Sequence, residues 1–399
     1  MSNKAPQPTT APSCIVQKYG GSSLQDVARL KQVARLIQQR HQQGQRLCVV
    51  VSAMGDTTNV LLSQAKSVTA RPAARELDML LTCGERMSMA LLAMALHELQ
   101  VPCVSFTGSQ SGIVTDGVHT AANIVDVRPL RVQQQLQRGK VVIVAGFQGV
   151  SADREITTLQ RGGSDATAVA LAAALKAQRC EIYSDVQGVY TADPRLVPQA
   201  QLLPKLHFNT MRELSVSGAQ VLNTQAVQLA AQHRIPLHAY QTGSPQPGTI
   251  VDQHPSTHPH DVVALSHIDE LCTLMLPDPT LLDNVLTQAK QEGLRVFHVA
   301  SSGLQGCGNM WLLLQKPLRQ AMTTPKWPKT AQQGPPLTAV SWVSTTQAAK
   351  QIPNALTILQ HQGVTVQAFC SHPLRASLFV PTQQGQQALQ ILHNRLLAA

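Results

Sequence analysis

Two short glycine-rich segments contain residue types that can bind anionic substrates. The first, KYGGSS (Lys18–Ser23), lies between an apolar stretch and a helical pattern. Its two glycines let the backbone approach a ligand closely, and a helix that begins here offers free N–H groups to an anion. Lys18 adds a mobile positive charge beside them. Alone, such a segment is more often an ordinary tight turn, so it indicates an anion site only in combination with others.

The second segment, RGGSDAT (Arg161–Thr167), repeats this design at another expected strand-to-helix junction. An arginine in this position can bind a carboxylate through two parallel hydrogen bonds. Asp165 falls in the first helical turn, where the helix dipole favours its charge, so simple capping is one interpretation. The other interpretation is that Asp165 holds Lys18 in position. Two such loops in one chain weaken the interpretation of either as a chance turn.

Strand-like and helix-like segments alternate over residues 14–251, which predicts a mostly parallel sheet with helices on both faces. The expected strands are Cys14–Tyr19, Leu47–Ala53, Val101–Phe106, Val141–Phe147, Cys180–Ser184 and Pro236–Tyr240. Helical spacing is found at about Leu24–Ile37, with Ser23 placed as its cap, and at Arg75–Leu99, Ser164–Ala177 and Ala219–His233. The chain has no GxxxxGK[ST] loop and no HRD or DFG segment, so neither a P-loop enzyme nor a protein kinase is expected.

The pattern changes after Gly248, and two smaller units follow. Each has the order β-α-β-β, which is typical of ferredoxin-like α+β units in tandem. The polar stretch HPSTHPH (His254–His260) marks the boundary, and the polar, Pro-rich N-terminus is expected to be a disordered tail. The expected organisation is a tail over 1–13, a first domain over 14–253, a small unit over 262–316, a linker over 317–336 and a second small unit over 337–399.

Composition excludes several classes of protein. The net charge is +10, but the Lys and Arg residues are scattered without a dense basic run, so no nucleic-acid partner is expected. No apolar run reaches the roughly 20 residues of a membrane span, and the N-terminus has no apolar signal segment. The eight cysteines form no CxxC pair, which argues against a zinc site or a disulfide scaffold. We expect a cytoplasmic protein with buried thiols and no bound metal of its own.

The motifs together resemble those of aspartate kinases, in the same order along the chain. They are KYGGSS, VVVSAMGDTTNVL, LLTCGERMSMALLAMAL, GSQSGIVTD, AGFQG, RGGSDATAVALAAALKA and CEIYSDVQGVYTADPRLVP, and they cover most of residues 15–200. The resemblance implies an α/β fold of the amino-acid-kinase type, a three-layer sandwich around a mostly parallel sheet. The two C-terminal units resemble, more weakly, the paired ACT domains of those enzymes. They imply a homodimer formed through these ACT-like units.

The resemblance also assigns roles to individual residues. Lys18 and Asp165 would be catalytic, with Asp165 organising Lys18. Substrate contacts are implied for Ser52, Thr57, Thr58, Glu85, Arg161 and Ser164. Glu85 would face the amine and Arg161 the α-carboxylate, although a surface charge on a helix is the plain alternative for Glu85. ATP contacts are implied for Lys18, Gly20, Gly21, Ser22, Ser184, Asp185, Tyr190 and Arg195.

The implied reaction is transfer of a phosphoryl group from ATP to L-aspartate, which gives ADP and 4-phospho-L-aspartate at the start of the lysine, threonine and methionine pathway. An aspartate carboxylate is ionised at neutral pH, so it can attack the γ-phosphorus without a general base. Such a transfer depends on in-line positioning and on neutralising the phosphate charge. Lys18, the loop N–H groups and a Mg²⁺ carried by the ATP phosphates would provide this.

The chain departs from the family pattern in SGAQVLNTQAVQLA (Ser217–Ala230). Gln220 replaces a lysine that ordinarily reaches the nucleotide phosphates, and Asn223 and Thr224 replace His-Pro. A neutral amide cannot neutralise charge, so the loss corresponds to on the order of a few kcal/mol of transition-state stabilisation. The residues that usually frame an effector pocket are not recognisable in the C-terminal units, which argues against feedback inhibition by lysine or threonine.

Two alternatives to an active aspartate kinase remain. The first is a weakened relative that serves as a ligand-binding or regulatory subunit, which Gln220 favours and the intact Lys18, Glu85, Arg161 and Asp165 oppose. The second is a sister kinase for glutamate, acetylglutamate or a nucleotide. Such kinases are not expected to match the GER and YTADPR segments together.

Overall fold

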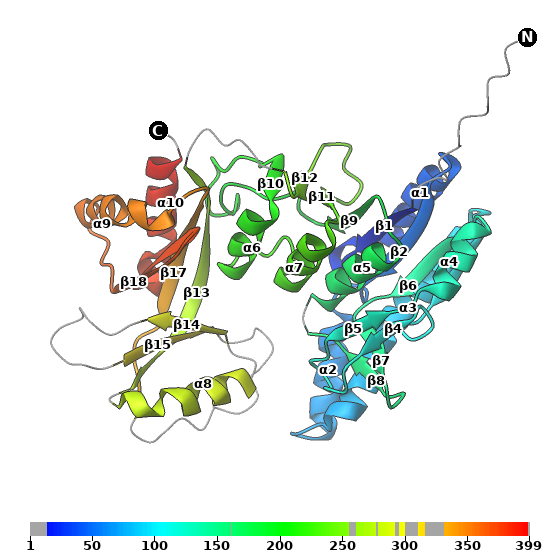
Figure 1. The fold of residues 1–399 in the computed structure, drawn as a ribbon, viewed down its shortest axis with the longest axis horizontal. Coiled ribbons are helices and arrows are strands. Elements are labelled where there is room, and N and C mark those ends of the chain that lie inside the picture. Colours follow the sequence, from blue (N-terminus) through cyan, green and yellow to red (C-terminus); the bar gives the residue numbers. More distant parts are fainter. Residues whose placement is uncertain are drawn as a thin grey trace, which may run out of the picture. The chain divides into compact units, whose positions relative to one another are not determined.

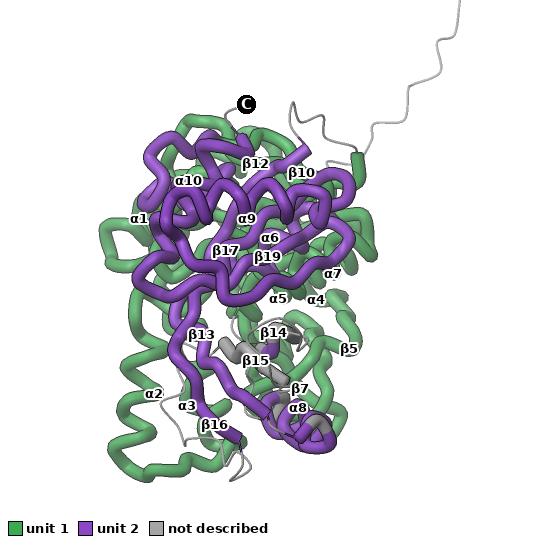
Figure 2. Tube along the Cα trace, turned by 90° about the vertical axis from the view of Figure 1, so that its left-hand side faces the viewer, with its two compact units in different colours: residues 1–189, 202–208, 220–256 green, residues 190–201, 209–219, 257–399 purple. Residues whose placement is uncertain are grey.

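The computed structural model describes residues 14–160, 162–254, 261–276, 278–291, 295–299, 310–315 and 331–397. The predicted tail 1–13, Arg161, and residues 317–330 of the predicted linker lie outside the described residues. The chain forms two compact units that alternate along the sequence (Figures 1 and 2). The first comprises residues 1–189, 202–208 and 220–256, and the second comprises 190–201, 209–219 and 257–399.

The first unit is built on an eight-stranded sheet with the order β10-β12-β11-β9-β1-β2-β6-β3. All neighbouring strands are parallel except β11 and β12, which confirms the predicted mostly parallel sheet. The strands are β1 (Cys14–Tyr19), β2 (Arg46–Val51), β3 (Cys103–Phe106), β6 (Val141–Ala145), β9 (Arg179–Ser184), β10 (Lys205–His207), β11 (Leu237–Gln241) and β12 (Thr249–Asp252).

Helices pack on the two faces of this sheet. The apolar stripes of α1 (Val27–Gln42) and α3 (Ala74–Glu98) share a core with alternate residues of β1, such as Ile15 and Tyr19. Because side chains along a strand alternate between faces, Lys18 points to the opposite side. On that side α5 (Gly163–Ala174) contacts β1, β2 and β9, and its alanine-rich surface is buried nearly all round, as expected of a core helix.

The first unit contains three further helices. These are α2 (Thr57–Val68), α4 (Leu130–Gln137) and α7 (Thr224–His233). The cap that the sequence predicts for α1 is wrong, because Ser23 lies in a short 3₁₀ turn and Asp26 caps the helix by accepting the Arg29 N–H at 2.8 Å. By length and composition, α3 also meets the criterion for a membrane span, a test that core helices of soluble proteins pass as well.

A small four-stranded sheet, absent from the sequence prediction, extends the first unit. Its order is β5-β4-β7-β8, from β4 (Ile113–Thr115), β5 (Ile124–Val127), β7 (Gln148–Ser151) and β8 (Ile156–Thr158). The carboxylate of Asp78, on α3, is fully buried and forms hydrogen bonds to residues in and beside this small sheet. It accepts hydrogen bonds from the Thr158 hydroxyl, the Thr120 N–H at 3.1 Å and the His119 ring at 2.7 Å. Asp78 therefore links α3 to β8, the strand that leads into α5.

The second unit contains one antiparallel sheet with the order β14-β15-β13-β17-β19-β18. Its elements are β13 (Val262–Leu276), α8 (Leu282–Gln291), β14 (Arg295–Val299), β15 (Met310–Gln315), β17 (Leu337–Ser344), α9 (Ile352–His361), β18 (Ala368–His372), β19 (Arg375–Pro381) and α10 (Gly385–Leu396); the short β16 (Gln332–Gln333) pairs with β13. The residues 190–201 and α6 (Phe208–Val216), apart from Phe208, are grouped with this unit.

The 15-residue strand β13 joins the two β-α-β-β repeats. Its first half pairs with β17 and its second half pairs with β15. The sequence predicts a strand only over Leu271–Leu276, because polar residues interrupt the apolar pattern before it. At that interruption Glu270 has a φ of 54°, and the register shifts between Ile268 and Leu271. The strand thus continues through a bulge that its composition conceals.

Candidate active site

An ion pair between Lys18 and Asp165 lies at the centre of the candidate site. Lys18 Nζ and Asp165 Oδ1 are 2.6 Å apart, and the two side chains are 12% and 10% exposed. Lys18 is near the end of β1, and Asp165 lies in the first turn of α5. The structure therefore brings together the two glycine-rich segments, and Asp165 does more than stabilise its own helix.

The loop after β1 approaches the backbone of its neighbours closely. The Gly20 N–H donates to the Tyr183 carbonyl at 3.1 Å, which fixes the loop beside the end of β9. At Gly21 a Cβ atom would lie 2.9 Å from the Ala53 carbonyl oxygen, a distance that real Cβ atoms do not adopt. The second glycine is therefore required by the close approach of two backbones.

The ends of three adjacent parallel strands gather the other predicted residues. Because β2, β1 and β9 run side by side, the segments that follow them meet at one edge of the sheet, where ligands of open α/β sheets bind. The Ser52 N–H donates to the Tyr19 carbonyl at 3.1 Å. The Ser22 hydroxyl donates to Asp185 Oδ1 at 3.3 Å. This bond joins the predicted ATP residues that follow β1 to those that follow β9. Ser184 lies beside Asp185 at the end of β9.

Glu85 is buried, so its interpretation as a surface charge is wrong. It is 3% exposed, and its Oε1 accepts the Ala53 N–H at 3.2 Å. The neighbouring Gly84 makes this possible, because a Cβ there would lie 2.7 Å from the Ala53 side chain. The close packing of α3 on the segment after β2 thus places a carboxylate beside this edge of the sheet. Thr57 and Thr58 begin α2 nearby, and the Thr57 hydroxyl donates to the Met54 carbonyl at 2.6 Å.

The segment before α5 contains Gly162, which has a φ of 84° and so adopts a conformation that favours glycine. A Cβ on Gly162 would collide with the Asn223 side chain. Asn223 also caps α7, since its Oδ1 accepts the N–H groups of Gln225 and Ala226 at 2.9 and 3.2 Å. The residue that departs from the family pattern therefore has a structural role here. Ser164 is buried beside Gly146, while Arg161 lies outside the described residues.

Two residues that the sequence predicts to bind the nucleotide lie outside the first unit, which contains the other described site residues. Tyr190 and Arg195 belong to the second unit. Arg195 there makes a two-pronged ion pair with Asp193, at 2.7 Å for the shorter contact, and its side chain is 84% exposed. Gln220, in place of the family lysine, belongs to the first unit and is exposed.

Sequence reasoning missed a buried carboxylate on the other face of the sheet. Glu181 of β9 accepts hydrogen bonds from Gln17 at 2.8 Å, Arg40 at 2.7 Å, Arg179 at 2.8 Å and Tyr183 at 3.0 Å. Burial alone would raise the pKa of Glu181, but these hydrogen bonds and the two guanidinium groups hold that pKa below its ordinary value. The network ties α1 and β1 to β9, directly behind the strand ends that form the site.

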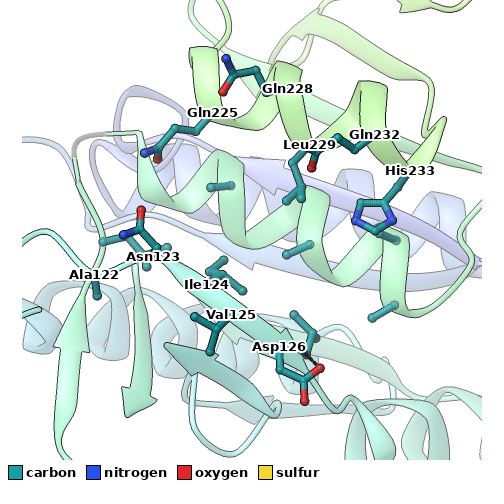
Figure 3. A pocket seen from close by; sticks show the side chains of 16 residues that line it. Ala122, Asn123, Ile124, Val125, Asp126, Gln225, Gln228, Leu229, Gln232 and His233 are labelled. Carbon is teal, nitrogen blue, oxygen red and sulfur yellow. Dashed lines mark hydrogen bonds between the residues drawn. The ribbon is translucent and has the colours of Figure 1, made fainter. Parts of the chain in front are cut away.

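A cavity of about 530 Å³ lies elsewhere in the first unit, between α5, α7 and the edge strand β5 (Figure 3). Alanines of α5 line one side, and Gln225, Gln228 and Gln232 of α7 line another. None of the predicted site residues lines this cavity. Among the described residues, no group of three or more His, Cys, Asp or Glu side chains could hold a metal ion.

Comparisons with known proteins agree with this arrangement. The model of the amino acid kinase family matches residues 13–239. The aspartokinase of Thermus thermophilus is 36% identical over 95% of this chain and 97% of its own length. The aspartokinase of Mycobacterium bovis is 53% identical over 59% of this chain, which spans 56% of the length of that relative.

Solved structures show the same fold. The crystal structure of an aspartate kinase from Synechocystis has a TM-score of 0.57 and 32% identity, covering 96% of this chain and 69% of that one. Escherichia coli aspartokinase III, solved with aspartate and ADP, has a TM-score of 0.81 at 22% identity, covering 96% of this chain and all of that one.

Proposed function

The chain belongs to the amino acid kinase family, and on that premise we propose that it is an aspartate kinase. It transfers the γ-phosphoryl group of ATP to the side-chain carboxylate of L-aspartate and releases ADP and 4-phospho-L-aspartate, the first step of the aspartate family of amino acids. The observation that supports this best is the ion pair of Lys18 and Asp165 at the shared edge of β1, β2 and β9.

Each part of the site has a role in this transfer. The aspartate carboxylate is ionised at neutral pH and is itself the nucleophile, so the protein needs no general base. Lys18 neutralises charge on the transferring phosphoryl group, and Asp165 keeps the ammonium in position. In the loop that Gly20 anchors to the Tyr183 carbonyl, the Gly21 N–H and the Ser22 hydroxyl bind phosphate oxygens, which the absence of a side chain on Gly20 lets approach closely. The nucleotide also contacts Ser184, Asp185, Tyr190 and Arg195.

The amino-acid substrate occupies the side of the site nearer α3. The buried carboxylate of Glu85 binds the substrate amine, while Arg161 and Ser164 bind its α-carboxylate. Ser52, Thr57 and Thr58 complete the contacts. The charges are complementary, because a zwitterionic substrate presents one cation and two carboxylates.

Mg²⁺ would be carried by the phosphates of ATP. Carboxylate oxygens are the ligands that Mg²⁺ prefers, and at this edge Asp165 is engaged by Lys18 while Asp185 is exposed. The oxygen donors therefore fit an ion that the ATP phosphates would hold, and Asp185 would be the carboxylate available to it. The ion would supply further neutralisation of the phosphate charge.

The proposal extends to the organisation of the chain. Residues 14–253 form the catalytic domain, and the units over 262–316 and 337–399, joined by 317–336, are ACT-like and hold two copies in a homodimer. The enzyme acts in the cytoplasm. Gln220 favours a second candidate, a relative that binds the same ligands without efficient transfer.

One assay separates these candidates. The purified chain is incubated with ATP, Mg²⁺, L-aspartate and hydroxylamine, which traps the acyl phosphate as a hydroxamate, with glutamate as control substrate. Signal with aspartate that is lost in Lys18→Ala supports the kinase. Folded protein that binds ATP or aspartate but gives no hydroxamate supports the second candidate, and signal with glutamate alone contradicts both.

A further inference from the structure

The segment 190–201 carries two of the residues proposed to bind ATP, Tyr190 and Arg195, and it is grouped with the second unit. Its side chains Ala192 and Val197 lie in a core that also contains the apolar face of α10. Ala192 is 3% exposed and Val197 is fully buried. The second unit therefore supports the backbone that carries both proposed nucleotide residues.

Hydrogen bonds of Thr191 close this segment into a loop. The Thr191 N–H donates to the Gln201 carbonyl at 2.8 Å, and the Gln201 N–H donates to the Thr191 hydroxyl oxygen at 2.9 Å. The Thr191 carbonyl accepts the N–H of Leu265, in β13, at 2.7 Å. Within the loop the Val197 N–H donates to the Asp193 carbonyl at 2.8 Å, which closes one helical turn. Thr191 thus forms the base of the loop.

Two polar side chains of α10 bind this loop at separate points. His393 Nε2 lies at hydrogen-bond distance, 3.0 Å, from the Thr191 hydroxyl oxygen. Gln390 Nε2 donates to the Leu196 carbonyl at 2.7 Å. His393 and Gln390 are three residues apart, so they lie on the same face of the helix. One face of α10 therefore holds both the base and the turn of the loop.

Each of these contacts lies beside one of the proposed nucleotide residues. Thr191 directly follows Tyr190, and Leu196 directly follows Arg195. A hydrogen bond to the backbone or side chain of the next residue restricts the direction in which a neighbouring side chain can point, because the two share a peptide unit. The contacts from α10 are thus placed where they can orient both nucleotide residues.

Packing alone does not explain a histidine at position 393. His393 is 6% exposed, and its neighbours Leu389, Leu392 and Leu396 on α10 belong to the apolar core of the second unit. Another apolar side chain would fill such a position, and burying an imidazole costs free energy unless it is hydrogen-bonded. The contact with Thr191 is the described interaction that offsets this cost.

We propose that His393 and Gln390 are positioning residues for ATP, an inference that rests on the proposed role of Tyr190 and Arg195. They act through the loop and need not touch the nucleotide. Because they keep the loop in one conformation, ATP binding does not carry the entropic cost of ordering it. The residues proposed to bind aspartate belong to the first unit, so a loosened loop weakens the binding of ATP more than that of aspartate.

Steady-state kinetics of the hydroxamate assay test the role of His393. His393→Leu keeps an apolar core of similar volume and removes the hydrogen bond to Thr191. The KM for ATP rises about three- to tenfold, as expected for one hydrogen bond, while the KM for aspartate changes by less than about twofold. His393→Gln, whose amide can bond to the same hydroxyl, restores most of the loss. Thr191→Val has a smaller effect in the His393→Leu background than in the parent chain, because both changes remove the same bond.

Two control variants separate positioning from general destabilisation. Gln387→Leu, at an exposed position of the same helix, leaves both KM values unchanged. Leu359→Ala, in the same core but on α9, lowers the melting temperature without raising the KM for ATP. An unchanged KM for ATP in His393→Leu overturns the proposal. So do an equal rise in both KM values, and a rise in the KM for ATP in Leu359→Ala as large as that in His393→Leu.

Equilibrium binding of ATP, measured by isothermal titration calorimetry, separates this inference from the kinase activity. If the parent chain binds ATP but forms no hydroxamate with aspartate, weaker binding by His393→Leu than by Gln387→Leu supports the inference although the proposed function fails. Equal ATP affinity of these two variants overturns the inference, whether or not hydroxamate forms. A folded parent chain that binds no ATP overturns both.

Discussion

Arg40 and Glu181 form an ion pair at 2.7 Å that joins the C-terminal part of α1 to the middle of β9. The carboxylate is 1% exposed, and three further donors complete its hydrogen bonding. A buried charge is tolerable only with such complete pairing. Glu181 therefore ties β9 to β1 and to α1 behind the candidate site.

Replacing Glu181 by Gln lowers the free energy of unfolding by about 3 kcal/mol at pH 7, because both guanidinium groups lose their counter-charge. The folded-state pKa of Glu181 is lowered, so its stabilisation is present above its ordinary pKa and is lost as the pH falls through the folded value. Urea unfolding at pH 7 and near pH 3 should show the difference shrinking at low pH. Glu155→Gln, in an exposed pair, is the control and costs below about 1 kcal/mol at either pH.

Gly21→Ala tests the close approach of the two loops. The new Cβ would lie 2.9 Å from the Ala53 carbonyl oxygen, so a backbone must move. We expect a loss of about 1–3 kcal/mol of stability and a larger relative loss of activity, since the shifted loop carries the proposed phosphate donors. Gly117→Ala, which meets no atom within 4 Å, is the matched control. Equal melting temperatures for the two variants would contradict the structural argument.

Asp165→Asn tests the positioning of Lys18. The variant keeps the shape of the side chain but removes the charge that holds the ammonium at 2.6 Å. We expect kcat to fall by about 10²–10³-fold with little change in the KM for aspartate, because the lost interaction acts on the phosphoryl group. A fall confined to KM would instead indicate a role in substrate binding. Steady-state kinetics of the hydroxamate assay distinguish the two.

Gln220→Lys tests the departure from the family pattern. Restoring a positive charge should raise kcat/KM for ATP by about tenfold, which corresponds to about 1.4 kcal/mol of transition-state stabilisation. Gln43→Lys, at another exposed position, adds the same charge away from the site and should have no effect. If both variants behave like the parent chain, the Gln220 side chain does not reach the nucleotide.

Six of the eight strands of the main sheet are predicted from sequence because they are largely buried and mostly apolar, whereas β10 and β12 are not among the expected strands. The expected strand Cys14–Tyr19 coincides with β1, and the run at Leu47–Ala53 overlaps β2. The small four-stranded sheet of the first unit is not predictable in this way, since its strands have only three or four residues and β5 is largely exposed. A pattern of period two needs more residues before it stands out from chance.

The candidate site is predictable in part. Lys18 and Asp165 come from segments distant in the sequence, so the resemblance to a family, not the spacing, indicates that they meet. The buried state of Glu85 depends on Gly84 fitting against Ala53, a contact that no local pattern reveals. Glu181 could have been found, because a lone carboxylate within an apolar strand predicts a buried partner.

The long strand β13 has a mechanical consequence. One continuous backbone serves both repeats of the second unit, with β17 paired to its first half and β15 to its second half. A ligand that pulls one repeat out of register must therefore strain the hydrogen-bond ladder of the other. The two repeats of the second unit are therefore coupled through one shared strand.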